Sequence, residues 1–273
     1  MSNMTITTQA EFIPEVWAQH INKHVKSKLV LANLVLDLSS EVSSAGDTIH
    51  IPNTTELSAN NKVAGTKVNL QAPTETSVTL SVDQHKESSF LIEDILKAQS
   101  SYNLMELYSQ GAGYAIAKAV DSSLAALASG FSQTKGTYNT AITTDVVLDS
   151  IKELDDEDVP EDDRHFVYRP DVKRDLLDLS TYTSKDFTSG SPVETGLVGD
   201  LYGVKTYMTN NIVKSVNNTD NMLFHRDALV MAMQQSPRVQ SEYSVEDLGW
   251  ITVADVIYGV IENRDVFGVL VKT

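Results

Sequence analysis

The sequence predicts an α+β fold, and three observations lead to this prediction. Two segments, Thr48–Ile51 and Thr76–Val82, alternate apolar and polar residues as half-buried β-strands do. One long segment, Asn103–Phe131, has apolar residues at helical spacing. The chain ends in two apolar segments, Gly249–Glu262 and Asp265–Val271, that are typical of strands. Together these segments indicate a mixed or antiparallel sheet combined with a few helices.

Length and composition restrict the class of protein. With 273 residues, 41% of them hydrophobic, the chain can bury one large core or two modest ones. No apolar run approaches the roughly 18 residues of a membrane span, and Met1–Ala10 lacks the pattern of a signal peptide, so we expect a soluble protein made in a cytoplasm. Cysteine is absent, which excludes disulfides, thiolate metal sites and cysteine nucleophiles.

The charge distribution argues against a dedicated nucleic-acid binder. The formal net charge is −16, whereas neutralising phosphates requires clustered lysine and arginine side chains. The basic residues are scattered along the chain. The acidic residues are concentrated between Asp145 and Asp163, where ten carboxylates are accompanied by Lys152 alone.

The first third of the chain predicts an arm, a helix and a long hairpin. Residues Met1–Ala10 are polar, and Phe12–Val30 has the apolar positions and the early proline of an amphipathic helix. Residues Asn53–Ala72 hold little apolar material that could join a core, so we expect a loop that projects between the two alternating strands. We expect the first strand to end at Pro52. Exposed hairpin edges invite pairing with another chain, which indicates a neighbouring subunit.

The segment Asn103–Phe131 is the strongest single element. Asn103 and Glu106 have the spacing of a capping box. A helix of roughly 28 residues is about 40 Å long at ~1.5 Å per residue, so we expect it to run through the whole subunit. Its predicted apolar stripe consists of Leu104, Leu107, Tyr108, Ile116, Val120, Leu124 and Leu127.

Shorter elements are predicted beyond Gly136. They include two helices, two strands and an acidic loop that covers Asp155–Asp163. In chain order we expect a helix at Asp145–Leu154, the acidic loop, a strand at His165–Tyr168, a helix at Pro170–Leu179, a loop at Thr188–Gly199, a strand at Val204–Thr209, an Asn-rich turn at Asn210–Asn221 and a strand followed by a helix at Met222–Gln235.

The order of these elements and several short phrases resemble a known family. The phrases are Glu11–Trp17 (EFIPEVW), Ala45–Pro52 (AGDTIHIP), Asp94–Asp121 in the long helix, Tyr168–Pro170 (YRP), Leu201–Asn211 (LYGVKTYMTNN) and Leu223–Ala228 (LFHRDA). Over nearly the whole chain, their joint order resembles the major capsid proteins of tailed bacteriophages, which have the Hong Kong 97-type (HK97-like) fold.

The resemblance implies a division of the chain into four regions. Residues 1–30 would form an N-terminal arm and first helix. Residues 31–140 would form a peripheral domain, with an extended β-hairpin loop at about 48–82 and a spine helix at about 103–131. Residues 141–221 would form an axial domain that meets its copies at five- and six-fold centres, and residues 222–273 would supply return strands to both domains.

The resemblance also implies a structural role rather than an enzymatic one. Copies of the chain would form pentamers and hexamers of an icosahedral head shell that encloses double-stranded phage DNA without sequence-specific binding. Implied partners are a separate scaffolding protein, a portal and a decoration protein, with assembly in the host cytoplasm and a final location in the virion. No membrane and no cofactor is expected. Because the first helix begins within a dozen residues, either the scaffold is separate or the chain already lacks a leader.

Nine residues are candidates for contacts between subunits. Lys62 and Lys67, beside Asn60 and Asn61, resemble the lysine and asparagine pairs that crosslink in some members of the family, although ordinary salt bridges or hydrogen bonds are the alternative. The acidic stretch forms either a solvated loop, a charged rim that disfavours wrong contacts, or a cation site. The nine candidates are Phe12, Trp17, Asn60, Asn61, Lys62, Lys67, Asp155, Asp156 and Glu157.

No catalytic or metal-binding constellation is expected. The acidic stretch lacks the alternating ligands and the glycine of a calcium loop, and Val159-Pro160 interrupts it. His20 and His24 have the spacing of two metal ligands, but no third ligand is evident. Motifs for a serine nucleophile or a phosphate loop are absent. Two rival functions remain: an encapsulin-like shell protein that holds a protein cargo, and an oligomeric binding module or hydrolase.

Overall fold

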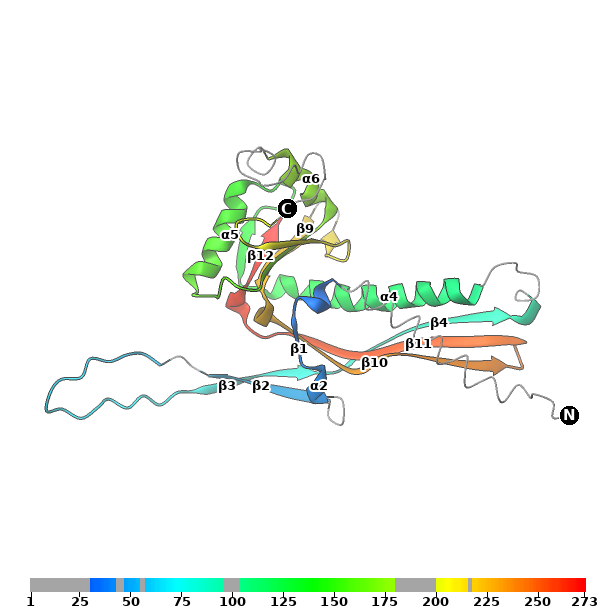
Figure 1. The fold of residues 1–273 in the computed structure, drawn as a ribbon, viewed down its shortest axis with the longest axis horizontal. Helices are drawn as coiled ribbons and strands as arrows, with labels where there is room; N and C mark the ends of the chain where they lie inside the picture. The colour runs from blue at the N-terminus through cyan, green and yellow to red at the C-terminus, as the bar shows by residue number, and fades with distance from the viewer. Residues whose placement is uncertain (1–29, 43–46, 55–56, 96–103, 180–199, 216–217) are drawn as a thin grey trace.

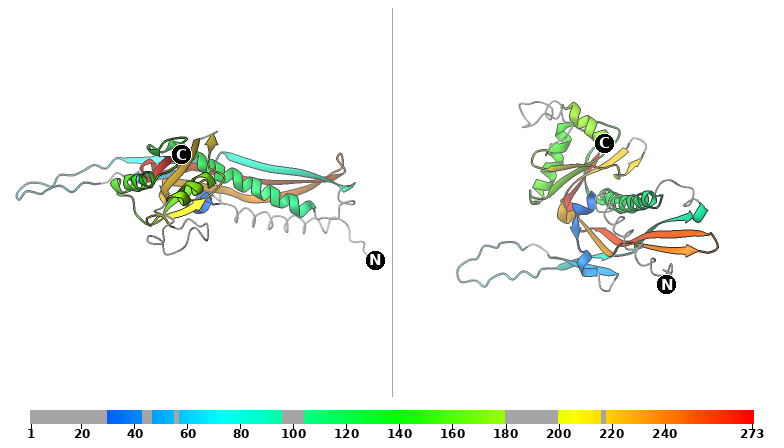
Figure 2. Two further views of the ribbon diagram at one scale, coloured as in Figure 1. Left: turned by 90° about the horizontal axis from the view of Figure 1, so that it is seen from above. Right: turned by 45° about the vertical axis from the view of Figure 1, so that its right-hand side comes forward.

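The protein consists of two lobes and a projecting hairpin (Figure 1). The computed structural model describes residues 30–42, 47–54, 57–95, 104–179, 200–215 and 218–273. An elongated lobe is built on a four-stranded sheet, and a compact lobe is built on a six-stranded sheet. Two further views show the hairpin extending away from both lobes (Figure 2). The predicted first helix, Phe12–Val30, lies outside the described residues except for Val30.

The elongated lobe contains the longest strands and the longest helix. Its sheet has the strand order β1-β10-β11-β4, in which only β1 runs parallel to its neighbour. The hairpin pairs β2 with β3 in antiparallel fashion. Its elements are η2 (Leu31–Asn33), β1 (Leu36–Asp37), α2 (Ser39–Val42), β2 (Thr48–Thr54), β3 (Glu75–Ser81), β4 (Gln84–Glu93), α4 (Leu104–Ala126), η3 (Leu127–Gly130), β10 (Leu229–Ser244) and β11 (Gly249–Glu262).

The compact lobe contains the shorter elements and the C-terminus. Its sheet has the order β5-β12-β9-β6-β7, and β8 pairs with β9 off this path. Its elements are β5 (Gln133–Gly136), α5 (Thr144–Asp156), β6 (Arg164–Tyr168), α6 (Pro170–Asp178), β7 (Lys205–Met208), β8 (Lys214–Ser215), β9 (Asn218–His225) and β12 (Gly268–Lys272). Short 3-10 turns, η4 (Arg226–Ala228) and η5 (Asp265–Phe267), lead from one lobe to the other.

Helix α4 joins the cores of the two lobes. Ile116, Val120 and Leu124 are buried at the spacing of one helical face, and they share a cluster with Tyr258 of β11 and with residues of β9 and β12. The predicted long helix is therefore confirmed. In its apolar stripe Ile116, Val120 and Leu124 are buried and Leu127 is partly buried, whereas Tyr108 is 49% exposed. The burial of Leu104 and Leu107 lies outside the described part of the structure.

The six-stranded sheet is covered on both faces. Val167, Met222 and Phe224 face the cluster that contains α4, whereas Phe166 and Leu223 face the cluster formed by α5 and α6. Side chains of a strand alternate between the faces, so neighbouring residues enter different cores. This arrangement explains why β6 is buried at all five positions.

The base of the hairpin is part of the elongated lobe's core. Ile49, Leu80 and Val82 are buried against Val230 and Ala232 on the face of the sheet opposite α4. The predicted hairpin and its apolar face are therefore confirmed. Beyond this base the hairpin has no described neighbour and runs outward (Figure 1).

Strand β2 is longer than expected. The prediction placed its end at Pro52, but pairing continues to Thr54, and Pro52 is matched with Ser77. Among the described residues β2 pairs on one side only, and an edge strand tolerates a proline because the missing N–H costs no ladder hydrogen bond.

Three further expectations required correction. The segment Met222–Gln235 contains no α-helix; η4 is followed directly by the 16-residue strand β10. The predicted turn Asn210–Asn221 includes β8 and the first residues of β9. Asp155 and Asp156 belong to the last turn of α5 rather than to the loop. By contrast, strand β11 has the bounds that were predicted.

Candidate functional site

The most exposed part of the described chain is the loop that closes the hairpin. Residues 57–74 have little regular structure, and every described side chain in this range is exposed. Four large apolar side chains are among them: Leu57 is 67% exposed, Val63 66%, Val68 63% and Leu70 87%. Exposed apolar groups that gather on one surface are typical of an interaction site.

The loop holds its shape through its own hydrogen bonds. The Ser58 backbone N–H donates to Oε1 of Gln71 at 3.0 Å, and the Gln71 side-chain amide donates back to the Ser58 carbonyl. At the tip, Gly65 has a φ of +82°, a conformation that glycine adopts without strain. The two arms of the loop are therefore tied together at Ser58 and Gln71, well away from the sheet.

The four predicted contact residues of the loop all lie near this tip and are exposed: Asn60, Asn61, Lys62 and Lys67. Nζ of Lys62 donates to the Val63 carbonyl at 3.1 Å and to the Thr66 carbonyl, so it closes the turn. Residues 57–74 include both lysines and no carboxylate, although the whole chain has a net charge of −16. The loop is thus a locally cationic segment of an acidic protein.

The acidic candidates lie elsewhere, at the end of α5 in the compact lobe. Asp155 and Asp156 occupy its last turn, and Glu157 is its C-cap. Arg164 is buried, and its guanidinium donates to Asp155 at 2.6 Å and to the carbonyls of Val159 and Pro160. The acidic loop is therefore folded around one buried arginine.

The remaining candidates fall on undescribed residues. Phe12, Trp17, His20 and His24 all lie outside the part of the chain that the structure describes. Within the described part, no group of three or more potential ligands could hold a metal ion. None of the helices there is long and apolar enough to cross a membrane.

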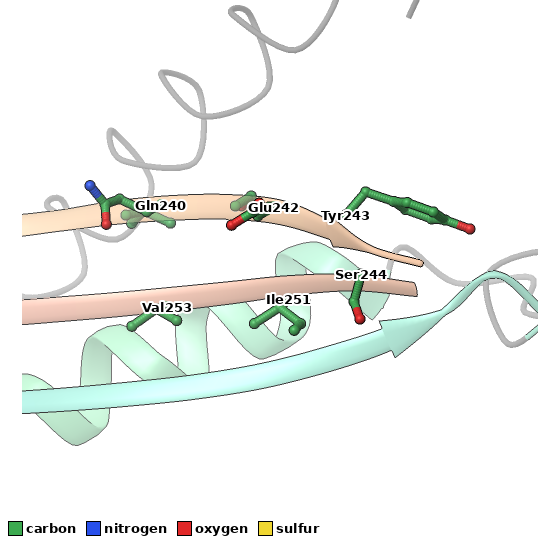
Figure 3. A pocket seen from close by; sticks show the side chains of 8 residues that line it. Gln240, Glu242, Tyr243, Ser244, Ile251 and Val253 are labelled. Carbon is green, nitrogen blue, oxygen red and sulfur yellow. The ribbon is translucent and has the colours of Figure 1, made fainter. Parts of the chain in front are cut away.

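A groove of about 750 Å³ lies at the end of the four-stranded sheet where β10 turns into β11 (Figure 3). The pairs Gln240–Val253 and Glu242–Ile251 face away from α4, because the adjacent pair Val239–Ala254 belongs to the core under that helix. Leu91 of β4 pairs with Ile251 and is 42% exposed. We call Ser89, Leu91, Gln240, Glu242, Ile251 and Val253 the outer face.

A buried carboxylate separates the outer face from the hairpin base. Asp255 accepts hydrogen bonds from Arg238 at 2.8 and 3.1 Å, from His85 at 3.1 Å and from Gln235 at 3.3 Å. Burial alone raises the pKa of Asp255, but the bonds from Arg238 and His85 outweigh it and hold the pKa below its ordinary value. The network lies beside a register shift between Gln235 and Arg238, so it fixes the strand at its irregular point.

The turn between β10 and β11 adds a second exposed apolar patch. Val245 is 75% exposed and Leu248 62% exposed. Behind the turn, the Tyr243 ring packs edge-on against Trp250, and its hydroxyl donates to Asp94 at 2.9 Å, a bond that raises the pKa of Tyr243. The turn is therefore ordered, although its apolar tips have no described neighbour.

The sequence interpretation missed the residues that define these surfaces. It treated the loop as polar, although Val68 and Leu70 alternate with polar neighbours, a pattern that could have identified them. The outer face gave no comparable signal, because Ile251 and Val253 lie in an apolar strand whose two faces look alike in sequence.

Comparison with known proteins assigns the chain to a family. The sequence model described as phage capsid protein matches residues 31–261 of the chain. Among curated proteins, no match was found.

Solved structures share the fold over most of the chain. A structure from Mycobacterium phage Che8 is 24% identical, with a TM-score of 0.78, and the match covers 89% of this chain and 90% of that one. The capsid structure of the cyanophage P-SCSP1u is 17% identical, with a TM-score of 0.72 and coverage of 89% and 87%. The mature capsid of bacteriophage PhiM1 is 15% identical, with a TM-score of 0.72 and coverage of 89% and 86%.

These matches confirm the HK97-like fold that the sequence implied. The chain belongs to the phage capsid protein family.

Proposed function

We propose that copies of this chain form the icosahedral head shell of a tailed bacteriophage, as pentamers and hexamers that enclose double-stranded DNA. The observation that carries the proposal is the hairpin, whose base is buried in the subunit core while its apolar tip is exposed. We expect a neighbouring subunit to cover the exposed apolar side chains of this tip.

The neighbour's outer face is the proposed receiving surface. It offers the apolar side chains of Leu91, Ile251 and Val253, next to the exposed Val245 and Leu248 of the adjoining turn. Charge supports the same pairing, because the loop is cationic whereas Glu242 lies on the outer face and further carboxylates flank it in the turn. Complementary charge orients the approach, and apolar burial supplies most of the affinity.

The compact lobe is the proposed axial domain. The described residues of the expected range 141–221 lie in this lobe, together with β5, β12 and the end of β9. Asp155, Asp156 and Glu157 would then face neighbouring copies around a symmetry axis, where their like charge disfavours wrong registers. Phe12 and Trp17 remain proposed contact residues of the N-terminal arm.

The acidic chain suits a container rather than a DNA-binding protein. Interfaces rather than DNA affinity must resist the pressure of a packaged genome, and several modest contacts per subunit close a shell by avidity. A separate scaffolding protein, a portal and a decoration protein are the proposed partners. Assembly would take place in the host cytoplasm, and the virion is the proposed final location.

Electron microscopy of the purified full chain, alone and with its candidate scaffolding protein, tests the proposal. We expect closed shells or capsomers with five- and six-fold symmetry, and nuclease-protected DNA in particles recovered from infected cells. A protein cargo without DNA would indicate a compartment shell instead. Small discrete oligomers under every condition would refute the shell.

A matched set of loop variants tests the proposed contact. Val68→Ser combined with Leu70→Ser removes two exposed apolar groups, whereas Asn69→Ser changes the residue between them. We expect the first variant to fold normally but to raise the critical concentration for assembly at least tenfold. The control variant should assemble as the wild type does. Equal assembly by both variants would show that the apolar tip is not a contact.

A further inference from the structure

Two carboxyl groups meet where the chain crosses between the lobes. Glu262 is the last residue of β11, and Asp265 begins η5, which leads directly into β12 of the other sheet. The two side chains are hydrogen-bonded to each other. The backbone N–H of Ser132, just after the spine helix, donates to Asp265 at 2.6 Å.

The Glu262 carboxyl packs against η3, the 3-10 turn that continues helix α4. A Cβ atom added to Gly130, the last residue of η3, would lie well within contact distance of Oε2 of Glu262. The same junction brings Gly268 so close to Phe131 that a Cβ atom there would overlap the ring. The carboxyl pair therefore connects three segments: the residues from η3 to Ser132, the end of β11 and the start of η5.

The turn η4, which leads from β9 of one sheet into β10 of the other, lies beside the carboxyl pair. Glu262 is matched in register with Leu229, the first residue of β10, and the Asn263 backbone N–H donates to the Ala228 carbonyl at 2.8 Å. All three described crossings between the two sheets, namely η3, η4 and η5, meet at this point (Figure 1). The carboxyl pair therefore lies where the chain passes between the two sheets.

A hydrogen bond between two carboxyl groups requires a proton. Burial, followed by the hydrogen bond and the charge of Asp265, raises the pKa of Glu262 to about 7. Burial opposes ionisation of Asp265 as well, but the bonds from Ser132 and Glu262 outweigh it and lower the pKa of Asp265. Glu262 is thus the donor of the pair, and Asp265 is the ionised acceptor.

Neighbouring charges do not replace the proton. The Arg264 guanidinium lies over the Phe267 ring at 4.8 Å, and Asp227 is 3.9 Å from His225; neither group is among those that shift the pKa of Glu262. Among the described residues, Asp265 is the one charged group that shifts the pKa of Glu262. Loss of the proton therefore leaves two adjacent carboxylates that form no ion pair with a cation in the described part of the chain.

We propose that Glu262 and Asp265 form a proton-held latch that fixes the orientation of the two lobes when the pair shares a proton and releases it when the proton is lost. On release, the Glu262 proton goes to solvent and the carboxylate turns away from Asp265, which stays bound to Ser132. This latch belongs to the subunit itself and does not depend on the proposed loop contact.

The sign of the pH dependence follows from the raised pKa of Glu262. A carboxyl whose pKa is higher in the folded state than in the unfolded chain contributes stability that is complete below its unfolded value of about 4.5. That contribution is lost as pH rises to about 7. The latch is therefore closed at pH 5.5 and open at pH 8.5.

Distance measurement between the lobes tests the latch. The chain has no cysteine, so spin labels at Gln110→Cys on α4 and Asp149→Cys on α5 report one distance in the full-length protein, diluted with unlabelled chain. By double electron–electron resonance we expect one narrow distribution at pH 5.5 and a distribution at least twice as broad at pH 8.5. Glu262→Gln keeps a neutral donor and should stay narrow at both pH values.

Two further variants complete the design. Asp83→Asn removes an exposed carboxylate between β3 and β4 and should retain the wild-type pH response. Asp265→Asn removes the neighbouring charge, so the transition should move to lower pH. A wild-type distribution that is unchanged from pH 5.5 to 8.5 would refute the latch. So would a Glu262→Gln variant that broadens as the wild type does.

Discussion

The two ends of the hairpin are expected to respond very differently to the same substitution. Leu80 is fully buried under the hairpin base, whereas Leu70 is 87% exposed at the tip. Leu80→Ala removes three buried carbon atoms, worth about 2.4 kcal/mol at ~0.8 kcal/mol for each, and the cavity left behind adds a further ~1 kcal/mol. We therefore expect the free energy of unfolding to fall by about 2 to 4 kcal/mol.

Urea denaturation of the unassembled subunit, followed by tryptophan fluorescence, measures this difference. With an m-value of about 3 kcal/mol/M, the midpoint for Leu80→Ala should fall by roughly 1 M. Leu70→Ala should change the free energy of unfolding by no more than about 0.5 kcal/mol while weakening assembly. Equal losses of stability in the two variants would refute the division of the hairpin into a buried base and an exposed contact tip.

Three further substitutions test other parts of the structure. Arg164→Met should destabilise the subunit by about 2 to 4 kcal/mol in urea, because it leaves buried carbonyls unpaired, and unchanged stability would contradict the role of Arg164. Gly268→Ala should cost about 1 to 3 kcal/mol, and Phe131→Leu should restore part of the loss; additive losses would rule out the contact. The pKa of Asp255 is lowered, so its contribution is present above about pH 4 and is lost as pH falls further. The stability difference between wild type and Asp255→Asn should therefore shrink between pH 5 and pH 3, and a constant difference would contradict the network with Arg238.

Elements whose apolar residues repeat with one clear period could be predicted from the sequence. Strand β11 has its predicted bounds because a glycine precedes its apolar run and polar residues follow it. The long helix was predictable because Ile116, Val120 and Leu124 repeat every four residues. The hairpin was predictable because Val78, Leu80 and Val82 alternate with polar residues.

Strand β10 could not be predicted because both of its faces are buried at its start. Leu229 and Met231 enter the core under α4, whereas Val230 and Ala232 pack against the hairpin base. The resulting run of consecutive apolar residues has no period, so it does not distinguish a strand from a helix. Only the tertiary arrangement, with a hairpin returning to cover the second face, decides between them.

The charge pattern explains how so acidic a chain can pack against copies of itself. Subunits with a net charge of −16 repel one another at long range, so a contact is favoured where a segment without carboxylates meets an acidic surface. The loop 57–74 is such a segment, because it carries two lysines and no acid. In the proposed contact, its apolar groups would supply short-range affinity, and its lysines would direct it toward acidic surfaces of the next copy. On this proposal, the acidity of the rest of the surface would keep subunits apart until the loop meets the outer face, so the charge would oppose random aggregation but not the specific contact.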